Sequence, residues 1–453
     1  MSSKSTRREF IQNTSAIGAG LWVTGGRSWA QEKAEKRSAN GQVSYACIGV
    51  GGKGRSDSSD AAQHGDVVAI RDVDDQTLEK SAKNPAFKNP ATFNDFREML
   101  DKMGDKIDAV TVSTPDHVHA VAAAMAMKAG KHCFCQKPLT HSVYEARMLA
   151  QIAREKGVKT QMGNQGTAAN GLREAAAIIQ AGYLGNVKEV HCMTNRPIWA
   201  QGGPRPEAAP VPPHVHWDLW LGPAPERPYA PGYHPFAWRG WWDFGTGALG
   251  DMACHTVNMP FMALNMADPV SIQATTSGHN QDSYPQSSKI VFEFPERDGR
   301  APFTFTWYDG GNLPSKDLLL GGDFVFTGKS ARGSIVVGEK ATLYATDDYA
   351  NDFKLLPEGE IEKPKVDFEA SPGHFTEFHE AILGKRDQAR SNFPNYAGPL
   401  SETILLGNLA VWVATEADVA GKKIEWNSEK MQATNAPEVA HVIHRDYREG
   451  YSL

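Results

Sequence analysis

The sequence predicts an α/β protein with two domains. A Rossmann-type, doubly wound parallel sheet is expected at residues 43–161, and an α/β domain with an open, mainly antiparallel sheet at residues 162–453. Up to residue 160, apolar strand-like runs alternate with helical runs of about 10–16 residues, as in parallel βαβ units. Beyond residue 270, short runs with period-two alternation indicate antiparallel strands.

The elements of the first domain follow from local patterns. Apolar strand-like runs lie at 43–48, 67–70, 107–114 and 131–137, and helical runs at 55–63, 117–130 and 142–157. Helices then cover both faces of the sheet, and ligands are expected beyond the carboxyl ends of its strands.

The second domain is predicted from a different pattern. A stretch rich in proline and aromatic residues (198–237) is expected to form a long, ordered loop. Helices are expected at 248–264, 371–384 and 399–417, and strands in VSIQATTS, KIVFEF, PFTFTWY, SIVVG and ATLYAT.

A glycine-rich turn follows the first strand. It reads Gly49-x-Gly51-x-x-Gly54, with Gly52 inside it, and the next strand-like run ends at Asp72. Such glycines permit a tight turn and close approach of a pyrophosphate, and the carboxylate can accept from ribose hydroxyls. The alternative is an ordinary glycine-rich surface turn. The context favours a dinucleotide site, with NAD expected from Asp72, although Arg71 leaves room for NADP.

The first 30 residues have the features of an export signal. Arg7 and Arg8 precede a small-residue, weakly apolar stretch, and Ser28-Trp29-Ala30 resembles a cleavage site. Paired arginines indicate the twin-arginine route and a periplasmic or otherwise exported protein. Residues 31–42 are expected to form a linker. The alternative is a basic N-terminal segment without a signal function. An exported nicotinamide enzyme would need to keep its cofactor tightly bound.

Composition excludes several classes of function. The net charge of −6 gives no electrostatic case for nucleic acid binding, and no apolar run is long enough to span a membrane. The five cysteines lie in apolar runs, which argues against a disulfide framework. No group of residues has a closed metal-ligand spacing, so no metal site is expected.

Three residues could carry proton and hydride chemistry. Lys137 lies at a predicted strand end, before Pro138, where it could donate to a substrate oxygen. Asp251 and His255 are four residues apart on a predicted helix and so share a face, and histidine suits removal of a hydroxyl proton. The alternatives are a solvated lysine and an Asp–His pair that only stabilises its helix.

The aromatic loop could bind a sugar, whose apolar C–H face stacks on rings while its rim needs polar partners. The alternative is that these rings only attach the loop to the core. The predicted substrate contacts are Gln165, His216, Trp238 and Arg239.

With these motifs together, the chain resembles the glucose–fructose oxidoreductase / inositol dehydrogenase (Gfo/Idh/MocA) family, and in particular its exported branch with a twin-arginine signal. The matching stretches are IGVGGKG, VSTPDHVHA, GKHCFCQKPLTHS and GALGDMACH. The family's Glu-Lys-Pro motif reads Gln136-Lys137-Pro138 here, so its carboxylate is absent.

The resemblance implies an NAD(P)-dependent oxidoreductase acting on a hydroxyl of a sugar, cyclitol or glycoside, and assembling into dimers or tetramers. It implies that Lys137 and Asp251 position the substrate, and that His255 is the acid/base. Thr114, Pro115 and His119 would lie near the cofactor, as would Lys137. Two alternatives remain open: a redox-neutral, NAD-dependent glycoside hydrolase or lyase, and a non-catalytic sugar-binding relative.

Overall fold

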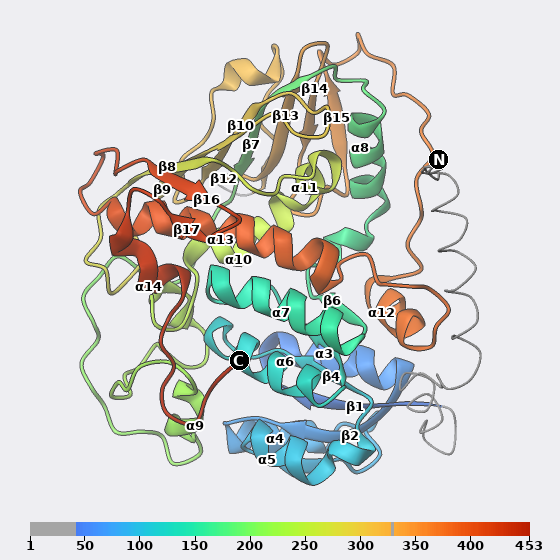
Figure 1. The fold of residues 1–453 in the computed structure, drawn as a ribbon, viewed down its shortest axis with the longest axis vertical. Helices are drawn as coiled ribbons and strands as arrows, with labels where there is room; N and C mark the ends of the chain where they lie inside the picture. Colours follow the sequence, from blue (N-terminus) through green and yellow to red (C-terminus); the bar gives the residue numbers. More distant parts are fainter. Residues whose placement is uncertain (1–41, 328–329) are drawn as a thin grey trace, which may run out of the picture. The chain divides into compact units, whose positions relative to one another are not determined.

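The computed structural model describes residues 42–327 and 330–453, and the predicted signal segment and most of the predicted linker lie outside these ranges. The first sheet has six parallel strands in the order β3-β2-β1-β4-β5-β6 (Figure 1). Its strands are β1 (Val43–Ile48), β2 (Gly65–Arg71), β3 (Ala91–Phe93), β4 (Ala109–Val112), β5 (His132–Cys135) and β6 (Thr160–Met162). The predicted doubly wound parallel sheet is therefore confirmed.

Five helices connect these strands, and their ends follow from local sequence. They are α3 (Gly52–His64), α4 (Asp75–Ala82), α5 (Phe96–Met103), α6 (Asp116–Lys128) and α7 (Val143–Lys156). In α7, Ser142 and Glu145 form a reciprocal capping box, and Gly157 ends the helix in the left-handed conformation.

The second sheet has nine strands in the order β15-β14-β13-β7-β10-β9-β8-β16-β17. Its pairs are antiparallel except for the parallel pair β7–β10, so the predicted mainly antiparallel sheet is confirmed. The strands are β7 (Val187–Met193), β8 (Ser271–Thr276), β9 (Ser288–Phe294), β10 (Phe303–Tyr308), β13 (Gly333–Gly338), β14 (Thr342–Ala345), β15 (Phe353–Leu356), β16 (Ile424–Asn427) and β17 (Gln432–Ala433). A separate hairpin pairs β11 (Phe326–Thr327) with β12 (Ser330–Ala331).

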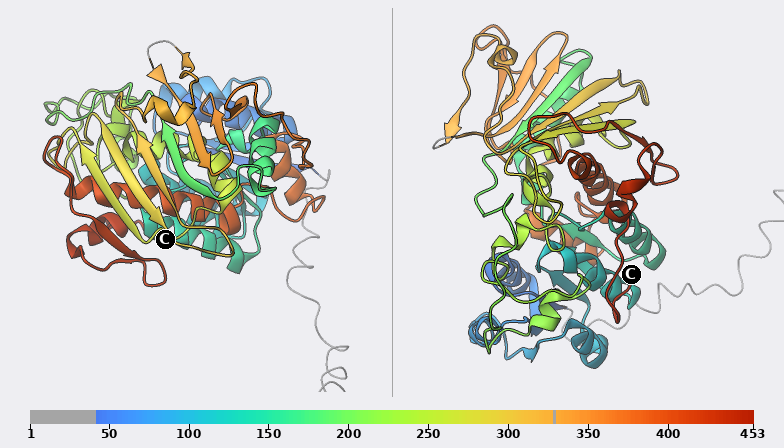
Figure 2. Two further views of the ribbon diagram at one scale, coloured as in Figure 1. Left: turned by 90° about the horizontal axis from the view of Figure 1, so that it is seen from above. Right: turned by 90° about the vertical axis from the view of Figure 1, so that its left-hand side faces the viewer.

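The helices in this part of the chain are α8 (Asn170–Gln180), α9 (Trp217–Leu221), α10 (Gly247–Thr256), α11 (Asn258–Leu264), α12 (His374–Ile382), α13 (Gly398–Val413) and α14 (Ala440–Ile443). Helices α10, α11 and α13 contact strands of the nine-stranded sheet. Helix α13 packs against α7 on one side and against β8 and β9 on the other. Figures 1 and 2 show it, in red, between the two sheets. This layer brings α10 to the edge of the first sheet.

Two predicted helices differ from the structure. The helix expected at 248–264 is divided at Val257 into α10 and α11, because Pro260 has no N–H to bond the carbonyl of Thr256. That carbonyl instead accepts a hydrogen bond from Cys192 Sγ at 3.5 Å. The helix expected at 399–417 ends at Val413, before a loop that pairs with β8.

Candidate functional site

The glycine turn between β1 and α3 is built for close backbone approach. Gly49 has φ +84°, and a Cβ added there would lie 2.6 Å from the carbonyl oxygen of Ser113. A Cβ at Gly54 would lie 2.1 Å from the carbonyl oxygen of Gly49. Gly51 precedes α3 without a side chain to cap it, so the first-turn N–H groups are free to bind a phosphate. The turn therefore fits a dinucleotide pyrophosphate.

Asp72 lies against this turn. Its Oδ2 accepts from the N–H groups of Val50 at 3.0 Å and Gly51 at 3.3 Å. Arg71 is buried over the ring of Phe96, and its Nε donates to the carbonyl of Asn94. The acidic side chain thus borders the nucleotide site while the arginine is directed away from it.

The turn after β4 completes this edge of the site. Thr114 and Pro115 precede α6, and Thr114 lies next to Ser113, which contacts the glycine turn. His119 is buried, with its ring nitrogens 2.8 Å from the carbonyl oxygens of Thr114 and Pro138. Burial lowers the pKa of His119 to about 4. His119 therefore joins two turns of the candidate site from within the core, and its place beside the cofactor stays a prediction.

Lys137 and Asp251 form the centre of the candidate chemical site. The Lys137 ammonium donates to Asp251 Oδ1 at 2.9 Å and to the Asp251 carbonyl at 2.6 Å, which links the turn after β5 to α10. Burial would raise the pKa of Asp251, but Lys137 and Arg239 outweigh it and lower the pKa to about 2. Asp251 is therefore a permanent anion that holds the lysine in place.

His255 lies one turn further along α10. It is buried, its ring meets Tyr349 edge-on at 4.9 Å, and its Nδ1 has no hydrogen-bond partner among the described residues. Burial, followed by the charge of Lys137, lowers the pKa of His255 to about 3. The imidazole is thus neutral near pH 7, which is the protonation state that a general base requires.

The missing family carboxylate at position 136 has a physical explanation. Gln136 Nε2 donates to Asp57 Oδ2 at 2.9 Å, and Asp57 also accepts from Ser113 Oγ at 2.7 Å. Asp57 is buried in α3 and pairs with Lys53. A glutamate at 136 would place a second carboxylate against Asp57, whereas the amide supplies a donor. The contact also ties the Lys137 turn to the helix that begins at the glycine turn.

The predicted substrate residues divide into two groups. Trp238 stacks on Arg239, whose Nε donates to Asp251 Oδ1 at 3.2 Å. Gln165 donates to the hydroxyl of Tyr349, which packs on His255. His216 instead pairs with Asp75 at 3.0 Å, beyond the carboxyl end of β2. The structure therefore brings Gln165, Trp238 and Arg239 to the Lys137–Asp251–His255 cluster, but not His216.

Sequence reasoning missed other residues of this site. Arg196 Nε lies 3.7 Å from Asp251 Oδ2. Asp116, the first residue of α6, is buried and accepts from Thr246 Oγ1 at 2.7 Å, and burial raises its pKa to about 7. The TPDH turn was a signal for Asp116. Arg196 and Tyr349 had none, because only the fold brings their segments to α10.

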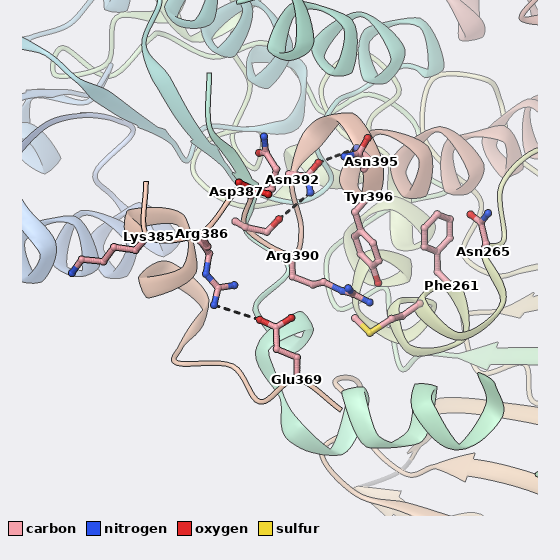
Figure 3. Close-up of a pocket in the computed structure, with 13 residues that line it drawn as sticks. Phe261, Asn265, Glu369, Lys385, Arg386, Asp387, Arg390, Asn392, Asn395 and Tyr396 are labelled. Carbon is pink, nitrogen blue, oxygen red and sulfur yellow. Dashed lines mark hydrogen bonds and ion pairs between the residues drawn. The ribbon is translucent and has the colours of Figure 1, made fainter. Parts of the chain in front are cut away.

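A separate cavity lies elsewhere in the fold. Its volume is about 800 Å³, and Figure 3 shows Arg386 paired with Glu369 and the Arg390 side chain running toward Tyr396. None of the residues of the Lys137–Asp251–His255 cluster lines it. Its size does not make it the chemical site.

Within residues 42–327 and 330–453, no group of three or more His, Cys, Asp or Glu side chains is placed to hold a metal ion. No helix in these ranges combines the length and apolar character required to cross a bilayer. The five cysteines are buried and free of disulfides.

Known proteins share parts of this sequence. A levoglucosan dehydrogenase of Pseudarthrobacter phenanthrenivorans is 24% identical over 191 residues, which are 42% of this chain and 40% of that protein. A 2,7-anhydro-N-acetylneuraminate hydratase of Escherichia coli is 31% identical over 93 residues, 20% of this chain and 24% of that protein. The chain spans between about a quarter and a half of the length of the curated relatives it matches.

The fold is also found in solved structures. The WlbA dehydrogenase of Bordetella pertussis, in complex with NADH and UDP-GlcNAcA, superposes with a TM-score of 0.57 at 16% identity, covering 84% of this chain and 98% of that chain. Residues 43–164 match the model of an oxidoreductase family with an NAD-binding Rossmann fold, and residues 175–301 match that family's C-terminal α/β domain. The chain belongs to the Gfo/Idh/MocA oxidoreductase family.

Proposed function

We propose that the protein is an NAD-dependent oxidoreductase that acts on a hydroxyl of a sugar, cyclitol or glycoside and holds its cofactor tightly. The observation that carries the proposal is the meeting of Lys137, Asp251 and His255 at the carboxyl edge of the Rossmann sheet. Gln136 connects this cluster to the helix of the glycine turn. A reacting carbon there would lie close to a bound nicotinamide.

Each residue has a defined task in this reaction. The neutral imidazole of His255 accepts the hydroxyl proton, and Lys137 donates a hydrogen bond to the same oxygen. Asp251 keeps Lys137 oriented through its carboxylate and its carbonyl. A bound NAD would supply the acceptor for the hydride of that carbon, so that the C–O single bond could become a carbonyl.

The carboxylate of Asp72 supports NAD over NADP. A 2′-phosphate would meet its negative charge, and the neighbouring Arg71 is buried on Phe96 instead of facing the site. The levoglucosan dehydrogenase relative supports a saccharide substrate.

A second candidate is redox-neutral chemistry, in which the bound NAD is reduced and reoxidised within one turnover. The 2,7-anhydro-N-acetylneuraminate hydratase relative favours it, because hydration leaves no net oxidation. Glycoside cleavage through a transient ketone would begin with the same hydride removal. Both candidates therefore need His255 and Lys137, and they differ in their products.

The proposed tight retention of NAD fits export through the twin-arginine route, for which Arg7, Arg8 and the following apolar segment are the support. We also propose that the protein forms dimers or tetramers, as its resemblance to the family implies.

A product assay tests the proposed function. Protein loaded with NAD is mixed with a panel of sugars, cyclitols and glycosides, absorbance at 340 nm reports NADH, and mass spectrometry identifies products. A dehydrogenase forms NADH and a ketone or lactone two hydrogens lighter than the substrate, or the acid that such a lactone gives on adding water. The redox-neutral enzyme gives hydrated or cleaved product without accumulating NADH. The variant His255→Gln should lose about a hundredfold or more of either activity. Wild-type turnover in this variant would refute the assigned base.

A further inference from the structure

The site around Asp251 carries an excess of positive charge. Lys137 Nζ lies 2.9 Å and Arg239 Nε 3.2 Å from Asp251 Oδ1, and Arg196 Nε lies 3.7 Å from Oδ2. The three cationic side chains are only 16%, 23% and 22% exposed, so water screens them weakly. Three cations therefore share one carboxylate.

The neighbouring charges do not remove this excess. Lys53 and Arg332 each add a cation, but these are paired with Asp57 and Asp348. Position 136 is a neutral amide, and His255 is uncharged near pH 7. Asp116 supplies part of one negative charge, because burial raises its pKa to about 7. An oxidised nicotinamide ring would bring a further positive charge.

The two guanidinium groups are held in place and retain free donors. Arg239 is stacked on Trp238 at 4.2 Å and Phe236 at 4.8 Å, with Nη1 bonded to the carbonyl of Phe236. Arg196 Nη1 is bonded to Asn195 Oδ1. In both arginines, Nη2 has no hydrogen-bond partner among the described residues. Fixed arginine donors suit carboxylate and phosphate oxygens.

We propose that the substrate is an acidic sugar, whose anionic group binds to Arg196 and Arg239 while its reacting hydroxyl faces Lys137 and His255. This inference rests on the proposed function and assigns its substrate class. A neutral sugar would leave the two Nη2 groups without an anion in a poorly solvated site. The acidic group supplies the missing negative charge and fixes which hydroxyl reaches the base.

Calorimetry on the NAD-saturated protein tests the inference without requiring turnover. D-Glucuronate, D-galacturonate and their methyl glycosides are compared with glucose, galactose and their methyl glycosides, and glucose 6-phosphate separates phosphate from carboxylate recognition. We expect at least one acidic sugar to bind about tenfold or more tightly than its neutral counterpart, with a preference that weakens as salt is raised. Equal affinities across every pair, or an acid panel that does not bind, would overturn the inference.

Variants separate recognition from a structural effect. Arg196→Gln should weaken acid binding about tenfold more than it weakens neutral-sugar binding, and Arg196→Lys should restore part of the acid preference. If Arg196→Gln does not fold, the same comparison of acidic and neutral sugars is made with Arg239→Gln. Arg205→Gln is the matched control, since Arg205 lies in the same loop but pairs with Asp282. Equal loss for acidic and neutral sugars would contradict the assigned role.

Failure of the proposed function can be distinguished from failure of the acidic-sugar inference. Preferential acid binding without NADH or product formation would reject the oxidoreductase reaction and keep the charge inference. Turnover of neutral sugars at least as efficient as that of their acidic counterparts would keep the oxidoreductase reaction and reject the acidic-sugar inference.

Discussion

Asp116 shows how burial changes the behaviour of a single residue. It begins α6, is almost fully buried, and is held by the hydroxyl of Thr246. Burial raises the pKa of Asp116 to about 7 in the folded protein, from 3.8 for the ordinary carboxyl. The folded state therefore keeps a proton at this site between these two pH values, and the unfolded state does not.

The variant Asp116→Asn tests how this protonation changes the free energy of unfolding with pH. The stabilising contribution of Asp116 is complete below pH 3.8 and is lost as the pH rises through about 7. The asparagine can still accept from Thr246 and does not ionise. Its unfolding free energy relative to wild type should therefore increase from pH 4 to pH 8, by about 4 kcal/mol at most. Denaturant unfolding at several pH values measures it, and a pH-independent difference would contradict the assignment.

At the same scale, local motifs were sufficient to single out Lys137, Asp251 and His255, which the structure brings together. It was not sufficient to explain Gln136, whose partner Asp57 lies 79 residues away. Nor could it indicate Arg196, which reaches Asp251 only because β7 leads its segment to α10.

The turn from β1 into α3 is the element on which nucleotide binding depends. A Cβ at Gly54 would lie 2.1 Å from the Gly49 carbonyl, so α3 and its N–H groups would have to move. Gly54→Ala should therefore weaken NAD binding by about tenfold or more. Gly104→Ala is the control, because nothing lies within 4 Å of its Cβ. Titration of NAD by calorimetry measures both, and wild-type affinity in Gly54→Ala would refute this account of the turn.

The aromatic loop is the element that sequence patterns described least well. The loop has a defined conformation, as expected, but its partners lie far away in the sequence. Val215 pairs with Asp74, and His216 and His234 contact Asp75 and Asp74, respectively. Such contacts depend on tertiary structure and leave no periodic signal in the chain. For this reason the sequence could not show that His216 lies beyond β2 and pairs with Asp75.

Across the whole molecule, the two sheets were predictable and the site between their layers only in part. Alternating βαβ runs and period-two strands predicted both sheets, because those patterns follow from local geometry. The site requires α10 to meet the turn after β5, and this contact depends on how α13 packs between α7 and the nine-stranded sheet. Packing of this kind depends on all the side chains of the core together, so a local sequence pattern does not predict it.

In the proposed enzyme, cofactor binding and substrate chemistry belong to different parts of one site. The variant Lys137→Ala separates the two, with NAD affinity and single-turnover NADH formation measured on the same preparation, and with Lys102→Ala, at an exposed lysine, as the control. We predict NAD binding close to wild type and hydride transfer slower by about a hundredfold or more. Near-normal transfer, or loss of NAD together with activity, would contradict the claim.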